Sequence, residues 1–201
     1  MVNFAYKNIR LLIHMTRQIP LEDFFRNSER TGYQLSPDGS YISYMAPYKD
    51  RLNVFVRRVD ETDEHAIRIT NETERSVAGY MWADNQRLLY MKDTAGDENY
   101  QLYGVHRDGS DDRAYTAFDG VRTSLIDDLE EQQGVVMIGM NKRNPEVFDP
   151  YRLNIETGEL TLLAENPGNI QGCMTDQEGR LREDTPIVDA VNTQSLNRDT
   201  E

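Results

Sequence analysis

The chain has little cysteine, little histidine and no long apolar run. Among 201 residues the single cysteine, Cys173, has no second cysteine for an internal disulfide, which favours a reducing compartment and predicts a cytoplasmic location. The three histidines are scattered, and no paired-cysteine or His-x-His pattern accompanies them, so we expect neither a metal site nor a cofactor. Residues 9–13 form an apolar cluster interrupted by Arg10, too short for a membrane span or a secretory signal.

Positive charge is also scarce. The chain holds 22 lysines and arginines against 35 aspartates and glutamates, a net charge of −13. This sign argues against nucleic acid as a partner, because a phosphate backbone attracts the opposite charge. With an apolar fraction of 38% and a mean hydropathy of −0.72, the composition predicts one domain with a thin core and many short, half-exposed strands.

A turn followed by a strand recurs along the chain. In Leu35-Ser-Pro-Asp-Gly-Ser-Tyr-Ile-Ser-Tyr44, Pro-Asp-Gly has the residues of a tight turn, and the aromatic and β-branched residues after it favour a strand. Comparable acidic turns follow at Asp84, Glu131 and Asp176, so that successive turn acids are 46, 47 and 45 residues apart. The chain is therefore predicted to be a repeat protein.

Two further series of residues confirm the repeat unit within the sequence. Phe55, Tyr103 and Tyr151 are spaced by 48 residues, and Thr70, Thr116 and Leu162 by 46. A period in the mid-forties with four strands per unit is typical of a β-propeller blade. The predicted strands are 33–35, 41–45, 53–59 and 65–70, then 77–82, 87–91, 100–106 and 113–116, then 123–127, 134–139, 151–155 and 160–163, and finally 170–175 and 180–182.

The fold class is accordingly all-β: a partial β-propeller with three four-stranded blades and an incomplete fourth. We divide the chain into three parts. Residues 1–18 are interpreted as a leader or a non-native extension, with a transit-like leader and a natural start at Met15 as the readings left open. Residues 19–182 form the partial propeller. Residues 183–201 are polar and are expected to form a tail without a third or fourth strand.

An ordered set of segments resembles a known family. The set consists of Ile19-Pro-Leu-Glu-Asp-Phe-Phe, the Ser-Pro-Asp-Gly turn, Gly96-Asp-Glu-Asn-Tyr-Gln-Leu-Tyr103, Asn141-Lys-Arg-Asn-Pro145, Asp149-Pro-Tyr-Arg-Leu153, Thr157-Gly-Glu-Leu-Thr-Leu162 and Glu165-Asn-Pro-Gly168. Together they resemble the N-terminal propeller of serine peptidases of the prolyl oligopeptidase family, in the acylaminoacyl-peptidase-like branch. The resemblance implies a propeller that admits peptides by size to an α/β-hydrolase domain carrying a Ser-Asp-His triad.

The triad itself has no counterpart here. A nucleophile elbow requires Gly-x-Ser-x-Gly, and no serine of the 201 residues lies in that pattern, so we predict no catalytic residue and no peptidase activity by the chain alone. The expected function is the substrate-gating part of an oligopeptidase-like protein, truncated or encoded apart from its hydrolase. The expected partners are peptides or a hydrolase domain, or further copies bound through open blade edges. The alternative is a stand-alone propeller that binds a protein or peptide.

Charged connections between second and third strands are the candidate site. They include Tyr48 to Arg51 in the first blade and Asp93 with Asp97, Glu98 and Asn99 in the second, while Lys142 and Arg143 occupy the third. Equivalent propeller loops emerge on one face, so these side chains are expected along a single rim. The binding candidates are Asp97, Glu98, Asn99, Lys142 and Arg143, where the acidic pair 97–98 is suited to a cationic peptide terminus. The simpler interpretation is solvated loop charge.

Overall fold

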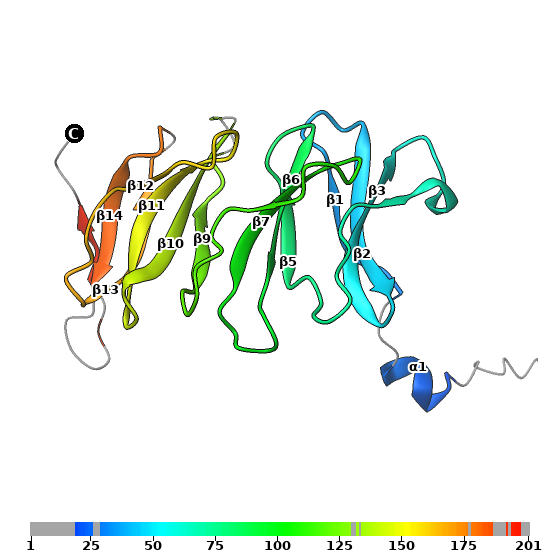
Figure 1. The fold of residues 1–201 in the computed structure, drawn as a ribbon, viewed down its shortest axis with the longest axis horizontal. Helices are drawn as coiled ribbons and strands as arrows, with labels where there is room; N and C mark the ends of the chain where they lie inside the picture. The colour runs from blue at the N-terminus through cyan, green and yellow to red at the C-terminus, as the bar shows by residue number, and fades with distance from the viewer. Residues whose placement is uncertain are drawn as a thin grey trace, which may run out of the picture.

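The protein forms four antiparallel sheets that follow one another along the chain (Figure 1). The computed structural model describes residues 19–25, 29–129, 132, 134–176, 178–186, 192 and 194–197. The short helix α1 (Leu21–Phe25) precedes the first sheet. The predicted leader, residues 1–18, lies outside the described residues.

Each of the first three sheets is a meander of four strands whose order in the sheet is their order in the chain. This arrangement confirms the three predicted four-stranded blades. The first sheet also contains a 3-10 helix, η1 (Asp63–His65), where the sequence predicted the start of a strand. The strands are β1 (Thr31–Leu35), β2 (Tyr41–Tyr48), β3 (Arg51–Arg58) and β4 (Ile67–Arg68), then β5 (Gly79–Trp82), β6 (Arg87–Lys92), β7 (Gln101–His106) and β8 (Arg113–Ala114), then β9 (Thr123–Asp127), β10 (Val135–Asn144), β11 (Val147–Asn154) and β12 (Leu160–Leu162).

The fourth sheet has three strands, β13 (Ile170–Thr175), β14 (Leu181–Pro186) and β15 (Leu196–Asn197). It confirms an incomplete fourth blade. Residues 183–201, however, were expected to add no third strand, and the structure has one. Strand β14 continues to Pro186, and β15 pairs with it through Asp184 opposite Leu196. Backbone hydrogen bonds hold this edge, and both residues of β15 are exposed, so the apolar alternation that marks a strand in a sequence is missing there.

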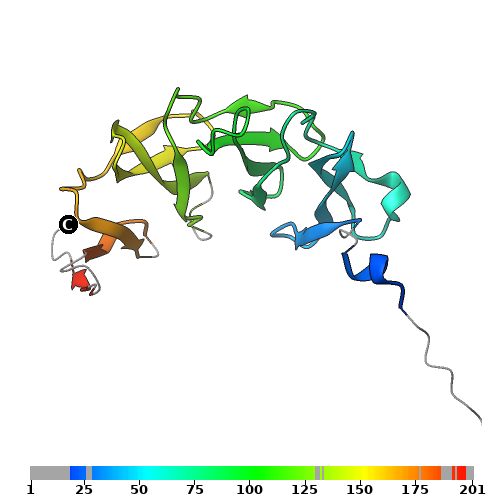
Figure 2. The same cartoon turned by 90° about the horizontal axis from the view of Figure 1, so that it is seen from below.

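The four sheets stand side by side along an arc, with the first strand of each sheet toward the concave side (Figure 2). The acidic turns at Asp38, Asp84 and Asp176 directly precede the second strands β2, β6 and β14, whereas Glu131 lies outside the described residues. At the first of them Gly39 adopts φ 69°, and the Asp38 carboxylate accepts hydrogen bonds from the Ser36 hydroxyl at 2.6 Å and the Ser40 amide at 2.9 Å. Both hydrogen bonds lower the pKa of Asp38, and the bond from the Ser36 hydroxyl has the larger effect. Asp84 and Asp176 accept backbone hydrogen bonds in the same way.

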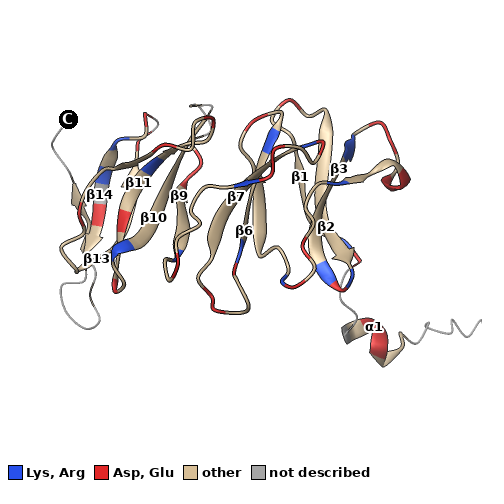
Figure 3. Ribbon diagram, in the orientation of Figure 1, with Lys and Arg blue, Asp and Glu red and all other residues tan. Residues whose placement is uncertain are grey.

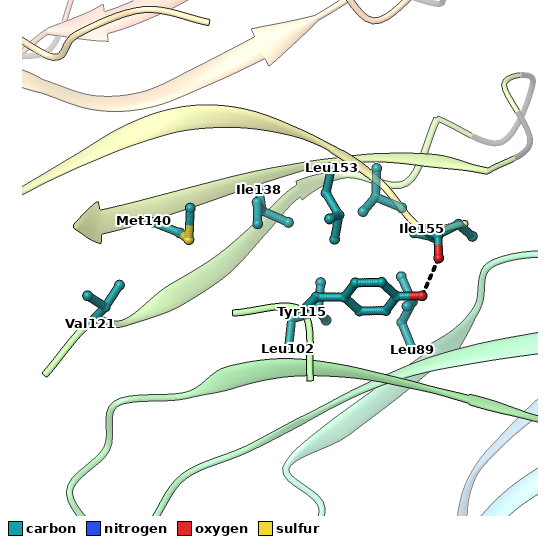
Figure 4. Packing of buried hydrophobic residues seen from close by; sticks show 9 residues of the cluster. Leu89, Leu102, Tyr115, Val121, Ile138, Met140, Leu153 and Ile155 are labelled. Atoms are coloured by element: carbon teal, nitrogen blue, oxygen red, sulfur yellow. Dashed lines mark hydrogen bonds between the residues drawn. The ribbon is translucent and has the colours of Figure 1, made fainter. Parts of the chain in front are cut away.

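The core lies between the sheets rather than within any one of them. Between the first and second sheets, the indole N–H of Trp82 donates to the Ser43 hydroxyl at 2.9 Å, and both residues are buried. Between the second and third sheets, Tyr115 lies across the interface and donates its hydroxyl to the Ile155 carbonyl (Figure 4). Around it pack the buried side chains Leu89, Leu102, Val121, Val136, Ile138, Met140 and Leu153. Each blade is therefore stabilised chiefly by its neighbour.

Candidate functional site

The connections between second and third strands all lie along one edge of the arc, the lower edge in Figure 1. They are the Lys49-Asp50 turn, the loop of residues 93–100, and the turn of residues 145–146. Figure 3 shows basic and acidic residues along this edge. We call it the hairpin edge. The two turns are tight, because β2 and β10 continue almost to the next strand.

The loop of residues 93–100 is the longest of the three connections and is organised by Asp97. Its carboxylate accepts hydrogen bonds from the backbone N–H of Thr94 at 3.3 Å and of Asn99 at 3.0 Å, and the Asn99 amide donates to it as well. Glu98 follows with φ 58° and an exposed side chain. A left-handed glutamate is uncommon, and such a conformation persists only when neighbouring contacts fix it. Both acids are exposed, but the Asp97 carboxylate is hydrogen-bonded within the loop, so Glu98 is the acid of the pair that is available to a ligand.

An ion pair between the half-exposed Arg75 and a buried aspartate fixes the start of this loop. The Asp93 carboxylate, with 2% of its side chain exposed, receives two hydrogen bonds from Arg75, from Nε at 2.9 Å and from Nη2 at 3.1 Å. The Arg75 guanidinium lowers the pKa of Asp93. Asp93 also accepts the backbone N–H of Glu98 at 3.4 Å. Because Arg75 precedes the second sheet, this pair ties the loop to the connection between the first two sheets.

Lys142 and Arg143 lie in strand β10, so the expectation that they belong to a connection is not met. The Arg143 guanidinium binds the Asp149 carboxylate, which is completely buried, at 3.0 and 2.9 Å, and also donates to the Asn166 carbonyl at 2.8 Å. The Lys142 ammonium lies 3.7 Å from the centroid of the Phe118 ring. Arg143 is therefore committed to holding the third blade to the chain that follows it.

The sequence interpretation missed a buried polar residue that recurs in each blade. Asn53, Gln101 and Asp149 lie two residues before the aromatic series and are at most 7% exposed. Asn53 binds the backbone N–H and carbonyl of Glu72, Gln101 donates to carbonyls of residues 118 and 121, and Asp149 accepts the Asn166 N–H. Each fastens the connection to the following sheet. Their regular spacing of 48 residues is the sequence signal from which these buried polar positions could have been predicted.

Two hollows flank the loop of residues 93–100. One, of about 380 Å³, is lined by Arg51, Arg75, Ser76 and Tyr100 between the first two sheets. The other, of about 200 Å³, lies on the side of Phe118. Such hollows beside a fixed, charged loop suit contact with an extended polar ligand. Within the described residues no three histidine, cysteine, aspartate or glutamate side chains lie close enough to hold a metal ion.

Sequence comparison finds relatives among the dipeptidyl peptidases. Dipeptidyl aminopeptidase BIII of Pseudoxanthomonas mexicana is 31% identical over 168 residues, which are 83% of this chain and 24% of that protein. Dipeptidyl peptidase family member 6 of Caenorhabditis elegans is 28% identical over 168 residues, 79% of this chain and 22% of that protein. The chain is a relative of these peptidases. It spans about a quarter of the length of each. No protein-family model matches it.

Solved structures confirm the propeller. The acylaminoacyl peptidase of Pyrococcus horikoshii superposes with a TM-score of 0.55 at 11% identity, over 84% of this chain and 30% of that one. An oligogalacturonate lyase superposes with a TM-score of 0.58 at 12% identity, over 84% of this chain and 50% of that one. The second likeness shows that the fold is shared between different activities. With the sequence relatives, the predicted resemblance to the propeller of prolyl oligopeptidase-family peptidases is confirmed.

Proposed function

We propose that this chain is the substrate-gating propeller part of a serine oligopeptidase-like protein and that it hydrolyses no peptide by itself. The relationship to dipeptidyl peptidases and the lack of any Gly-x-Ser-x-Gly in the 201 residues support this assignment. The catalytic residues then belong to a hydrolase domain or chain that the propeller contacts. A cytoplasmic location belongs to the same proposal and rests on the single cysteine. No helix among the described residues is long and apolar enough to cross a membrane.

The outward-facing Glu98 is the observation that carries the substrate side of the proposal. Its backbone is held in a left-handed conformation by the loop that Asp97 and Asp93 fix. Its side chain is exposed, and neighbouring residues of the same loop line a hollow on each side. A carboxylate on a fixed backbone attracts the free ammonium group of a peptide through a charge-assisted hydrogen bond. We assign Glu98 to binding the peptide amino terminus, with Asp97 and Asn99 holding the loop in place.

Two measurements separate the parts of this proposal. A fluorophosphonate probe should label no serine of the purified chain, because no activated nucleophile is available to attack the phosphorus. Stoichiometric labelling of one serine would show that the chain is a hydrolase by itself and would end the first part.

The second measurement compares peptides with free and acetylated amino termini by fluorescence anisotropy. The free form should bind roughly two- to fivefold more tightly, as expected for an ion pair at an exposed carboxylate, and Glu98→Gln should remove that difference. Glu146→Gln is the matched control, since Glu146 is an exposed glutamate on the β10–β11 turn of the same edge. Equal binding of both peptides by the unaltered chain would contradict the role of Glu98 but leave the gating assignment standing.

The alternative of a stand-alone binding module has one structural observation in its favour. The outer face of the first sheet, on the side away from the second sheet, exposes Tyr33 by 53% and Leu35 by 58%. An exposed apolar face of a sheet is suited to a partner. Rescue of peptidase activity on addition of a separately expressed hydrolase chain would support the gating function. Tight binding of peptide with no rescue by such a chain would favour the stand-alone module.

A further inference from the structure

A cavity of about 360 Å³ lies between the third and fourth sheets, and no residue of the loop of residues 93–100 lines it. Strands β10 and β11 supply Gly139, Phe148 and Pro150, strand β9 supplies Ile126, and Cys173 of β13 closes the opposite side. Arg122 lies at the start of β9 and also lines it. The volume falls in the range of small-molecule sites, which are mostly apolar with a few polar groups.

The repeat explains why space remains here. Gly139 pairs with Pro150 on β11, as Met45 pairs with Val54 in the first sheet and Met91 with Leu102 in the second. Met45 packs against the core between the first two sheets, and Met91 packs against the core between the second and third. At the same position of the third sheet, glycine presents no side chain to the fourth. The cavity is the space that a methionine fills in the two preceding blades.

A second glycine shows that such space is not left open everywhere. A Cβ atom added at Gly104 would lie 2.5 Å from Cε2 of Tyr115, because the tyrosine ring already covers that glycine. A Cβ atom added at Gly139 would lie tightly against Oγ of Ser124 at 3.0 Å and in ordinary contact with the side chains of Ile126 and Phe148 at 3.6 Å, so that only the Ser124 hydroxyl has to move. The ring of Phe148 therefore stays in ordinary contact distance of Gly139, whereas the ring of Tyr115 leaves no room for a side chain at Gly104.

The charge of the lining indicates the kind of ligand. Arg122 is the one charged residue of the lining, and its side chain is exposed. Two other arginines near the hairpin edge, Arg75 and Arg143, are each neutralised by a buried aspartate. Arg122 has no such acid among the described residues, and its guanidinium lies 6.0 Å from the centroid of the Tyr100 ring. A guanidinium beside an apolar hollow recognises a carboxylate through paired hydrogen bonds.

We propose that this cavity binds a small carboxylate with an apolar tail of about the size of an amino-acid side chain. The tail occupies the space beside Gly139, against Phe148 and Ile126, and the carboxylate pairs with Arg122 at the mouth. The lining of this site includes no residue of the loop of Glu98, and its existence does not depend on the peptidase-related function proposed above.

The probes are 3-phenylpropionate and its neutral amide, titrated into the full chain by calorimetry. The carboxylate should bind at one saturable site, about tenfold more tightly than the amide, because only the carboxylate pairs with Arg122. Arg122→Gln should lower the affinity for the carboxylate to that for the amide. Arg58→Gln removes the same charge from an exposed pair in the first sheet and should change nothing. Equal affinities for the two probes, or no saturable binding of either, would overturn the proposal.

A substitution that fills the cavity tests whether the ligand binds there. Gly139→Met restores the residue type of the preceding blades and should abolish binding while the far-ultraviolet circular dichroism spectrum stays unchanged. Since Ser124 must turn aside for the new Cβ, a second measurement uses the unaltered chain. Alkylation of Cys173, the single cysteine, should be slowed at least about fivefold by saturating 3-phenylpropionate, because a bound ring covers the thiol. Undiminished alkylation, or full binding by a folded Gly139→Met chain, would place the ligand elsewhere.

Discussion

At the scale of single residues, the hairpin edge separates charges that hold the fold from charges that face outward. The guanidinium groups of Arg75 and Arg143 bind buried aspartates, and the carboxylate of Asp97 accepts hydrogen bonds from its own loop. Removing one partner of a buried pair leaves an uncompensated charge, so such residues are poor candidates for ligand binding. Glu98 and Arg122 form no ion pair with a described residue, and the two proposals rest on them.

The pair of Asp93 and Arg75 predicts a defined dependence of stability on pH. Arg75 lowers the pKa of Asp93 in the folded chain. The ionised pair therefore stabilises the fold above the ordinary pKa of aspartate, about 3.9, and this contribution is lost as the pH falls through the lower pKa of the folded state. Without Arg75, the buried carboxylate should protonate at higher pH.

The test is the urea midpoint of Arg75→Met measured from pH 3 to pH 7. The variant should be less stable than the unaltered chain near neutral pH, and the difference should shrink below about pH 4. Arg58→Met is the control, because Arg58 and Asp60 form an exposed pair of small expected value. A difference that stays constant down to pH 3 would mean that Arg75 acts through packing alone.

At the scale of elements, the turn before each second strand sets the repeat. Gly39 has φ 69°, a conformation that costs a residue with a side chain about 1 kcal/mol. Gly79, in β5, is not among the glycines with positive φ, and an added Cβ would meet nothing within 4 Å at either position. The two glycines therefore differ in backbone conformation but not in the room available to an added side chain.

We expect Gly39→Ala to lower the free energy of unfolding by about 1 kcal/mol. Gly79→Ala should leave it unchanged or raise it slightly, since alanine loses less backbone freedom than glycine when a strand forms. Chemical unfolding of the two variants side by side measures both effects. Equal losses would show that the left-handed turn is not what glycine provides at residue 39.

The same elements show what a sequence can and cannot predict. The strands of the first three blades were predictable because turn acids and aromatic residues recur at fixed steps. Two features of the site could not be predicted in this way, because they depend on how neighbouring strands are aligned. The pairing of Arg143 with Asp149 requires β10 to continue to Asn144 and to face β11 in one alignment. The hollow beside Gly139 requires comparison with Met45 and Met91, whose equivalence becomes evident only when the ladders are aligned.

At the scale of the whole molecule, the blades are built to be covered on both faces. The rings of Tyr90 and Tyr103 stack at 5.2 Å on the face of the second sheet toward the first, where Tyr90 is 1% exposed. The corresponding pair in the first sheet, Tyr44 and Phe55, stacks at 5.7 Å on the face away from the second sheet. No other described sheet covers that face (Figure 2). Tyr44 is nevertheless only 3% exposed, because Tyr33 packs on it, and the exposed apolar surface of this face is Tyr33 itself, at 53%.

This exposed face predicts that the 201-residue chain self-associates and that salt promotes the association. Apolar surface of this kind favours contact, whereas a net charge of −13 opposes it until salt screens the repulsion. Light scattering across a salt series measures the effect. Tyr33→Ser with Leu35→Thr should keep the chain monomeric at high salt, while Leu162→Thr, on the exposed edge strand β12, should behave like the unaltered chain. A monomer at every salt concentration would show that the outer face of the first blade does not drive association, and association retained by the double variant would place the contact at the fourth sheet.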